Sequence, residues 1–171
     1  MQRERWSQAC AEAVTRVIVP FTRRLPEVEA ALSDAEWIDV SSDDEAYWRL
    51  LCDIWAERQS VVIVEHDIIP APGAVESLKS CMREWCACPY PFEAVEALVG
   101  LGCTKFGSTL MYRLPDLIER VGRMGSGVHP PRHWCSLDGL VQSKLVEAQV
   151  HVHRHEPATH LSTVRSHEGC R

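Results

Sequence analysis

Residues 61–70 read Val-Val-Ile-Val-Glu-His-Asp-Ile-Ile-Pro, an apolar run that leads directly into two acids flanking a histidine. Four consecutive apolar residues predict a buried strand over 61–64. Side chains alternate along an extended backbone, so Glu65 and Asp67 are expected on one side, close enough to share a hard divalent cation, with His66 on the other. Ligands bind at the carboxyl ends of strands in open α/β sheets. The stretch therefore predicts either a cation site or an ordinary solvated strand end.

The segments around this stretch alternate between strand and helix patterns. Short apolar segments predict strands over 17–19 and 37–40. Helix-forming residues, or apolar residues at helical spacing, predict helices over 27–32, 45–58 and 74–84. This β-α-β-α-β-α order predicts a parallel, right-handed sheet with helices on its faces.

The C-terminal half has a less regular pattern. Residues 101–107 are flanked by glycines, which predicts a segment whose backbone can approach a ligand closely. Helices are predicted over 115–121 and 134–148, the second with Ser136 as its N-cap. The alternating residues 149–153 predict a final strand.

Length and charge restrict the class of protein. A chain of 171 residues that is 46% hydrophobic is expected to form one domain. Its formal net charge of −6 argues against nucleic-acid binding by bulk electrostatics. No apolar run approaches the roughly 20 residues of a membrane span, and residues 1–6 lack the apolar core of a signal peptide. A soluble, cytoplasmic protein with no membrane partner is expected.

Eight cysteines allow a further interpretation. Without a secretory signal they are expected to be reduced thiols, many of them buried as small hydrophobic residues. The nearest approach to a zinc motif is Cys81-x4-Cys86-x-Cys88, which lacks the paired C-x2-C spacing of common structural sites. A non-catalytic zinc-binding interaction module is therefore an alternative to an enzyme.

Two further features carry candidate chemistry. Asp138 is expected in the first turn of a helix, where the helix dipole would hold it ionised and able to accept a proton, although a plain N-terminal helix acid is equally expected. Downstream, His151, His153, His155 and His160 fall within ten residues. The first three alternate, which favours either a ligand-binding face or the solvated face of an edge strand.

The order of these features resembles the GT-A-fold nucleotide-sugar glycosyltransferases. In that family an acidic D-x-D motif follows a strand, a catalytic x-E-D acid comes later, and a metal-binding histidine follows the last strand. The corresponding residues here are Val61–Pro70, Leu137-Asp138 and the late histidines, and the resemblance spans Val17 to His160. The chain departs from the pattern in two ways: Glu65 replaces the first aspartate, and Asp138 is a single acid where the family often has two.

The resemblance implies an α/β fold, with a single Rossmann-like GT-A-type domain over 1–171 and a mostly parallel central sheet with helices on both faces. Within it, a nucleotide-binding part would cover about 15–85 and an acceptor-binding, catalytic part about 86–165. By resemblance Asp67 binds Mn²⁺ or Mg²⁺, with His160 as the first choice and His155 as the second for the C-terminal metal ligand.

The same resemblance implies the remaining site residues. Asp138 would take the proton of the acceptor hydroxyl in an inverting displacement, and Glu65 would point toward the ribose or a metal-bound water. The residues expected to contact the donor are Pro20, Phe21, Thr22, Arg23, Glu65, His66 and Gly102.

The activity implied by the resemblance is that of a metal-dependent hexosyl- or pentosyltransferase that uses a nucleotide sugar, with a UDP-sugar as the expected donor. Short enzymes of this kind are similar to bacteriophage glycosyltransferases, some of which modify hydroxylated DNA bases. Modified DNA, in a host cytoplasm, is therefore one acceptor to consider, although the acidic charge does not favour it. A metal-dependent phosphoesterase, using the same acids and histidines, is a second enzymatic alternative.

Overall fold

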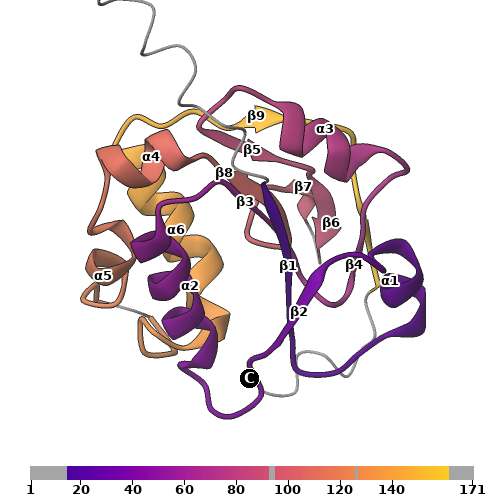
Figure 1. Cartoon of the computed structure of the whole chain (residues 1–171). Coiled ribbons are helices and arrows are strands. Elements are labelled where there is room, and N and C mark those ends of the chain that lie inside the picture. Colours follow the sequence, from indigo (N-terminus) through magenta and orange to yellow (C-terminus); the bar gives the residue numbers. More distant parts are fainter. Residues whose placement is uncertain (1–14, 93–94, 126, 162–171) are drawn as a thin grey trace, which may run out of the picture.

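The computed structural model describes residues 15–92, 95–125 and 127–161, and helices and strands alternate along much of the chain (Figure 1). The helices are α1 (Pro26–Ala31), α2 (Ala46–Glu57), α3 (Ala74–Ser80), α4 (Ser108–Arg113), α5 (Leu117–Val121) and α6 (Trp134–Glu147). The strands are β1 (Arg16–Phe21), β2 (Glu36–Asp39), β3 (Val61–Val64), β4 (Ile68–Ile69), β5 (Trp85–Ala87), β6 (Tyr90–Phe92), β7 (Val95–Leu98), β8 (Cys103–Phe106), β9 (His153–Arg154) and β10 (Thr159–His160).

A six-stranded sheet with the order β2-β1-β3-β8-β5-β9 forms the centre of the molecule. β1 is parallel to both β2 and β3, and β9 is parallel to β5. β8 runs antiparallel to its neighbours β3 and β5. The carboxyl ends of β1, β2 and β3 therefore share one edge of the sheet, where the acids at residues 65 and 67 follow β3.

Helices cover both faces of this sheet, and each face has its own core. α2, α4, α5 and α6 lie on one side, and α1 and α3 lie on the other (Figure 1). Neighbouring β1 residues alternate between the cores, since Ile18 packs in the first and Val19 in the second. Val62 and Ile63 of β3 divide in the same way. The predicted α/β class, with a mostly parallel sheet and helices on both faces, is confirmed.

The N-terminal elements lie close to their predicted positions, and the differences have local causes. β1 continues through Pro20, which lacks an N–H. Proline is tolerated there because β1 pairs with β3 only over Arg16–Ile18 and with β2 alone at Pro20. The helix predicted over 74–84 ends at Ser80, because Trp85–Ala87 joins the central sheet as β5.

The main error in the sequence prediction concerns residues 101–107. Their glycines predict a segment whose backbone approaches a ligand, but Cys103–Phe106 is the fully buried strand β8. Its two polar residues are satisfied by tertiary hydrogen bonds. Thr104 accepts from Trp85 Nε1 (3.1 Å) and donates to the Cys86 carbonyl (3.0 Å), while Lys105 Nζ donates to two backbone carbonyls.

Two small sheets complete the fold. β10 pairs antiparallel with β4, which places His160 opposite Ile68, and β6 pairs antiparallel with β7. The final strand predicted over 149–153 is instead β9, which begins only at His153.

Three expectations about the cell environment and the thiols can be compared with the structure. No helix in the described ranges is long and apolar enough to cross a membrane. Residues 1–6, on which the signal-peptide argument rests, lie outside the described residues. Cys52, Cys81, Cys86, Cys88 and Cys103 are free thiols as predicted, whereas Cys135 is disulfide-bonded, contrary to the prediction.

Candidate functional site

The candidate site begins where β3 leaves the sheet. β3 is buried along its whole length. Immediately after it, Glu65 N donates to the Gly102 carbonyl (2.8 Å) and Ile68 N donates to the Glu65 carbonyl (3.0 Å). Residues 65–68 thus form a tight turn and not the extended segment predicted. The two carboxylates are nevertheless close enough for the charge of Asp67 to contribute to raising the pKa of Glu65.

Asp67 meets His160, the first-choice partner from the sequence. The β4–β10 pairing brings His160 Nε2 to 3.4 Å from Asp67 Oδ2, and Leu161 N donates to the Asp67 carbonyl (2.8 Å). Burial raises the pKa of the Asp67 carboxyl, but the hydrogen bond and charge of His160 and the charge of His66 outweigh burial and lower it. Asp67 is therefore held as a carboxylate.

Aromatic rings fix the position of His160. The Tyr90 ring stacks on it at a centroid distance of 5.8 Å, and the Phe92 ring contacts it edge-on at 5.3 Å. Both aromatic residues belong to β6. The imidazole is thereby oriented toward Asp67 by packing as well as by the backbone pairing.

Asp138 reaches the same region from α6. Leu101 N donates to Asp138 Oδ1, and a Cβ at Gly100 would lie 2.8 Å from both carboxylate oxygens. The glycine thus leaves the space that the carboxylate occupies. Burial and the charge of Asp67 raise the pKa of Asp138, opposed by hydrogen bonds from Leu101 N and the Tyr90 hydroxyl.

Asp138 lies one turn further into α6 than the sequence predicted. α6 begins at Trp134, with His133 as the N-cap whose ring accepts from Cys135 N. Ser136 is therefore inside the helix, and the first turn holds no acid. Because Asp138 lies in the second turn, its protonation is governed by burial and neighbouring groups and not by the helix dipole.

Glu65 completes a group of three acids with Asp67 and Asp138. Burial and the charges of Asp138 and Asp67 raise the pKa of Glu65 well above its ordinary value, although the nearby Tyr47 hydroxyl stabilises its charged form. That buried hydroxyl makes no hydrogen bond of normal geometry among the described residues. It lies near the Glu65 carboxylate, the acid whose charged form it stabilises.

The loop after β1 lies beside His66. The His66 ring hydrogen-bonds to the Pro20 carbonyl. Burial lowers the pKa of His66 and the charge of Arg23 acts in the same direction, while Asp67 opposes them. Phe21 packs edge-on against Trp37 of β2, and Thr22 is exposed. Of the predicted donor contacts, Pro20 and Arg23 are thus brought near His66, whose charge in turn acts on Asp67.

Two other predicted residues lie in different surroundings. A Cβ at Gly102 would come within 2.6 Å of the Tyr90 ring, so Gly102 makes room for Tyr90, and its carbonyl accepts from Glu65 N. His155, the second-choice metal ligand, contacts Ser77 (2.8 Å) and His153 (3.2 Å) and not Asp67. It belongs to a separate cluster of histidines and cysteines.

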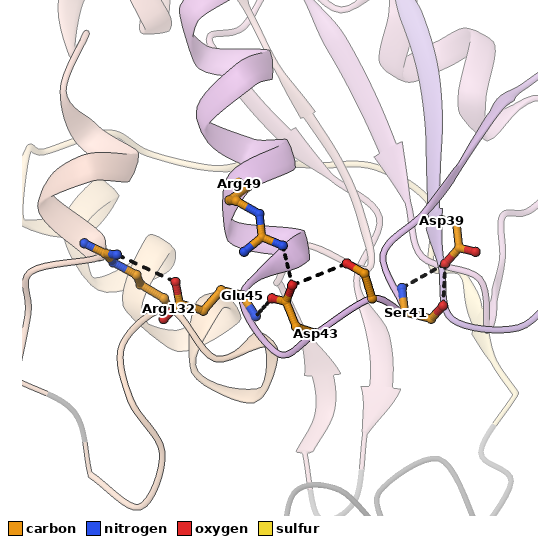
Figure 2. A network of polar contacts seen from close by, with 7 residues as sticks. Asp39, Ser41, Asp43, Glu45, Arg49 and Arg132 are labelled. Atoms are coloured by element: carbon orange, nitrogen blue, oxygen red, sulfur yellow. Dashed lines mark hydrogen bonds and ion pairs between the residues drawn. The ribbon is translucent and has the colours of Figure 1, made fainter.

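A polar network orders the connection from β2 to α2 (Figure 2). Asp39 accepts from the backbone N (2.8 Å) and hydroxyl (2.6 Å) of Ser41. Asp43 accepts from Glu45 N (2.9 Å) and pairs with Arg49 (2.6 Å). These contacts fix the start of α2, the helix that carries Tyr47.

The same connection joins the start of α2 to the start of α6. Arg132 lies 3.6 Å from the Glu45 carboxylate (Figure 2), and Trp134 N donates to the Asp44 carbonyl (3.1 Å). His133 also contacts the Asp44 side chain (3.6 Å). The two helices that supply Tyr47 and Asp138 are therefore held together at their N-terminal ends.

The residues of this site fit a hard divalent cation. None of the three carboxylates has a lysine or arginine within ion-pair distance in the described parts of the chain. Carboxylate oxygens with an imidazole nitrogen suit Mn²⁺ or Mg²⁺. A cation would offset the repulsion among these acids, which together with desolvation, the larger cause, raises the pKa of Glu65 and Asp138.

Tyr47 and Tyr90 are the two site residues that the sequence did not identify. Tyr47 has the helical spacing of a core residue, and its hydroxyl carries no sequence signal. Tyr90 lies between two prolines, a pattern that indicated only an interruption of regular structure. Only the tertiary arrangement brings both hydroxyls to the acids.

A cavity of about 750 Å³ lies elsewhere on the molecule, lined by residues of β1, β4 and α3 and the α1–β2 connection. Its lining does not include the three acids or His160. The chemistry-bearing side chains therefore do not lie in this cavity.

Comparisons with known proteins identify the fold. By sequence, the chain matches no family model and no curated protein. By structure, it is similar to a glycosyltransferase involved in the glycosylation of the major capsid of PBCV-1, with a TM-score of 0.53 and 7% identity over 89% of this chain and 96% of that one. It is also similar to a putative nucleotide-diphospho-sugar transferase from Desulfovibrio desulfuricans G20, with a TM-score of 0.51 and 12% identity over 96% and 72% of the two chains. The chain therefore has the fold of nucleotide-sugar transferases, as its resemblance to the GT-A fold predicted.

Proposed function

We propose that this protein is a metal-dependent glycosyltransferase that moves a sugar from a nucleotide-sugar donor to an acceptor hydroxyl. The observation that carries the proposal is the meeting of Asp67 and His160 beside the half-buried acids Glu65 and Asp138. This group lies at the edge where parallel strands end, which is the ligand-binding edge of such sheets. The fold shared with a viral capsid glycosyltransferase and a putative nucleotide-diphospho-sugar transferase supports the same activity.

The donor is proposed to bind along the carboxyl ends of β1 and β3. A UDP-sugar is the preferred candidate, with residues of about 15–85 forming the nucleotide-binding part. Arg23 supplies a cation near the diphosphate, and His66, which is held by the Pro20 carbonyl, lies beside it. The acceptor would then face the part that begins at about residue 86, whose predicted limit of 165 extends beyond the described residues.

Asp67 and His160 are the proposed ligands of Mn²⁺ or Mg²⁺. Asp67 is suited to this because its pKa is lowered and it stays charged. When bound there, the cation would neutralise the charge of the diphosphate leaving group. Tyr90 and Phe92 keep His160 facing Asp67, and Glu65 is placed to hydrogen-bond the ribose or a metal-bound water.

Asp138 is the proposed general base. The Leu101 N–H orients its carboxylate, and its raised pKa increases its basicity relative to an exposed aspartate. The acceptor oxygen attacks the anomeric carbon, the bond from that carbon to the diphosphate breaks, and the acceptor proton passes to Asp138. Such a displacement inverts the configuration at the anomeric carbon.

The acceptor is proposed to be a small or polymeric hydroxyl compound. DNA that carries hydroxylated bases is one candidate, from the resemblance to short bacteriophage enzymes. The formal charge of −6 gives no bulk attraction to DNA. Simple alcohols and sugars therefore belong beside hydroxymethylated DNA in any acceptor panel.

The direct test is incubation of the protein with Mn²⁺, a panel of nucleotide sugars and the acceptor panel, measuring nucleoside diphosphate release and sugar transfer. We expect metal-dependent release that increases when an acceptor is present. Release of phosphate from phosphoesters, without transfer to any acceptor, would instead establish the phosphoesterase alternative.

The Asp138→Asn variant tests the proposed base. We expect UDP binding to be unchanged and transfer to fall about 10²- to 10⁴-fold, the usual contribution of general base catalysis. Asp53→Asn, an exposed change on α2, is the matched control and should be fully active. Wild-type transfer by Asp138→Asn would show that another group accepts the proton.

A further inference from the structure

A second cluster of metal-ligating side chains lies apart from the acids. Cys81 follows α3, Cys86 lies in β5, His153 lies in β9, and His155 follows β9 directly. One potential ligand atom from each of these four residues lies within 4.8 Å of the other three. We infer that these residues, which we call the Cys2His2 cluster, form a structural zinc site.

The spacing of the ligand atoms fits one tetrahedral ion. Cys81 Sγ lies 3.3 Å from His153 Nδ1, and His153 Nδ1 lies 3.2 Å from His155 Nε2. Zinc bonds of about 2.3 Å to sulfur and 2.0–2.1 Å to nitrogen give ligand-to-ligand separations of roughly 3.3–3.8 Å in a tetrahedron. These two separations already match a shared zinc ion, and the remaining pairs, all within 4.8 Å, would need only a small approach.

A neighbouring hydroxyl prepares His155 for metal binding. Ser77 Oγ lies 2.8 Å from His155 Nδ1. When Nδ1 donates its hydrogen to this hydroxyl, Nε2 is left with a lone pair directed into the cluster. Metal-bound histidines in proteins almost always have such a partner on the second ring nitrogen.

A buried lysine provides an electrostatic reason for thiolate ligands. Lys105 lies opposite Cys86 in the β5–β8 pairing and is only 5% exposed. Its ammonium donates to the carbonyls of Cys81 (2.7 Å) and Arg83 (2.8 Å), and no carboxylate of the described chain lies within ion-pair distance of it. This positive charge would partly offset the negative charge of the two thiolates that a bound zinc ion requires.

The composition of the cluster separates it from the proposed catalytic site. Two sulfurs and two nitrogens form a closed set of the kind found in structural zinc sites, whereas Asp67 and His160 suit a hard cation with open positions. Cys88, included in the sequence motif, lies away from the cluster and hydrogen-bonds with Cys103. Cys81 and Cys86 of that motif are instead joined by two histidines that lie about 70 residues downstream.

The position of the cluster indicates what the metal would do. β9 is a two-residue strand at the edge of the sheet, and both of its residues are exposed. Zinc would tie this strand to the turn between α3 and β5. Because β9 leads into β10, the same tie would restrain the segment that presents His160 to Asp67.

The test is the zinc content of the purified full chain and the absorption spectrum of the protein loaded with Co²⁺. We expect one zinc per chain, and a sulfur-to-cobalt charge-transfer band with the visible bands of tetrahedral cobalt. Cys81→Ser and His153→Ala should each lose stoichiometric zinc, and Ser77→Ala should weaken zinc binding by about 10- to 100-fold. His153 is exposed, so its variant keeps the test valid if Cys81→Ser folds poorly.

Cys52→Ser and His151→Ala are matched controls outside the cluster and should keep zinc. Asp67→Ala should also keep it, which separates this inference from the proposed transferase activity. A full chain that binds no zinc and shows no sulfur-to-cobalt band would overturn the inference. Zinc binding that survives in both Cys81→Ser and His153→Ala would do the same.

Discussion

Three carboxylates shielded from bulk water to different degrees define the site at the scale of single residues. Glu65 and Asp138 both have raised pKa values because they are partly removed from water and lie near other acids. Keeping such groups charged at neutral pH opposes folding. Glu65 and Asp138 nevertheless lie beside Asp67. Binding a cation, or accepting a proton from a reacting hydroxyl, is a function that requires acids in this arrangement.

The Glu65→Gln variant should be more stable than the wild type at neutral pH without metal. The unfolded carboxyl titrates near 4.5, whereas the folded one titrates well above that value. Between these pKa values the folded state binds more protons, so the free energy of unfolding of the wild type falls as the pH rises. The glutamine side chain of the variant does not titrate, so the variant does not lose this free energy of unfolding as the pH rises.

Urea denaturation across a pH series, with metal removed, measures the effect. The two proteins should differ least near pH 4 and increasingly at higher pH. Glu156→Gln, a change of an exposed acid, should follow the wild type. A Glu65→Gln variant that is less stable at all pH values would show that the carboxylate has a stabilising partner.

At the scale of elements, close packing between loops and helices positions the acids. The segment from Gly100 to Gly102 packs against both Asp138 and Tyr90, and a Cβ at either glycine would collide with one of them. Tyr90 in turn stacks on His160. The glycines therefore connect the position of the proposed base to that of the proposed metal ligand.

The Gly102→Ala variant tests this connection. The added methyl group meets a rigid aromatic ring, so we expect a loss of about 1–3 kcal/mol in the free energy of unfolding, as for other overpacked sites. Displacement of Tyr90 should also weaken Mn²⁺ binding through His160. Denaturant unfolding and Mn²⁺ titration measure the two effects.

Gly139→Ala is the matched control, because nothing lies within 4 Å of its added Cβ. This glycine is inside α6, where alanine should stabilise the helix by about 0.5–1 kcal/mol. The same substitution is thus expected to have opposite signs at the two positions. A neutral Gly102→Ala would mean that Tyr90 can move without cost.

At the scale of the whole molecule, the C-terminal segment closes the structure. β9 adds to one edge of the central sheet, and β10 crosses to β4 and brings His160 to Asp67. Residues more than 90 positions apart therefore form the proposed metal site. Ligands that bind there should stabilise the whole fold.

Mn²⁺ and UDP together should raise the free energy of unfolding. A ligand present at 100 times its dissociation constant stabilises the folded state by about 2.7 kcal/mol. We expect a corresponding rise in the thermal midpoint when UDP is added with Mn²⁺, and a smaller one with either alone. Differential scanning calorimetry gives the measurement.

Asp67→Ala is the variant that should abolish this stabilisation while the fold survives. Its baseline unfolding should remain cooperative, since Asp67 lies in a turn and not in either core. Equal stabilisation of Asp67→Ala by Mn²⁺ with UDP would place the metal elsewhere.

Local patterns in the sequence predicted most elements of the N-terminal half of the fold and the long helix α6. The apolar run of β3, the helical spacing of α2 and α6, and the alternation of strands with helices all express burial by neighbouring residues, which a periodic pattern records. β8 escaped prediction because Thr104 and Lys105 interrupt its apolar pattern. Their burial depends on hydrogen bonds to residues of β5 and the turn before it.

The candidate site, like the fold, was predicted in part by local patterns and in part was decided by tertiary contacts. The sequence by itself determined which acids and histidines were available and that the acids follow a buried strand, because these are properties of adjacent residues. Only the tertiary structure decided that His160 meets Asp67, that His155 joins two cysteines instead, and that burial governs the protonation of Asp138. Strand pairing and desolvation act between segments distant in the chain, and no local pattern encodes them.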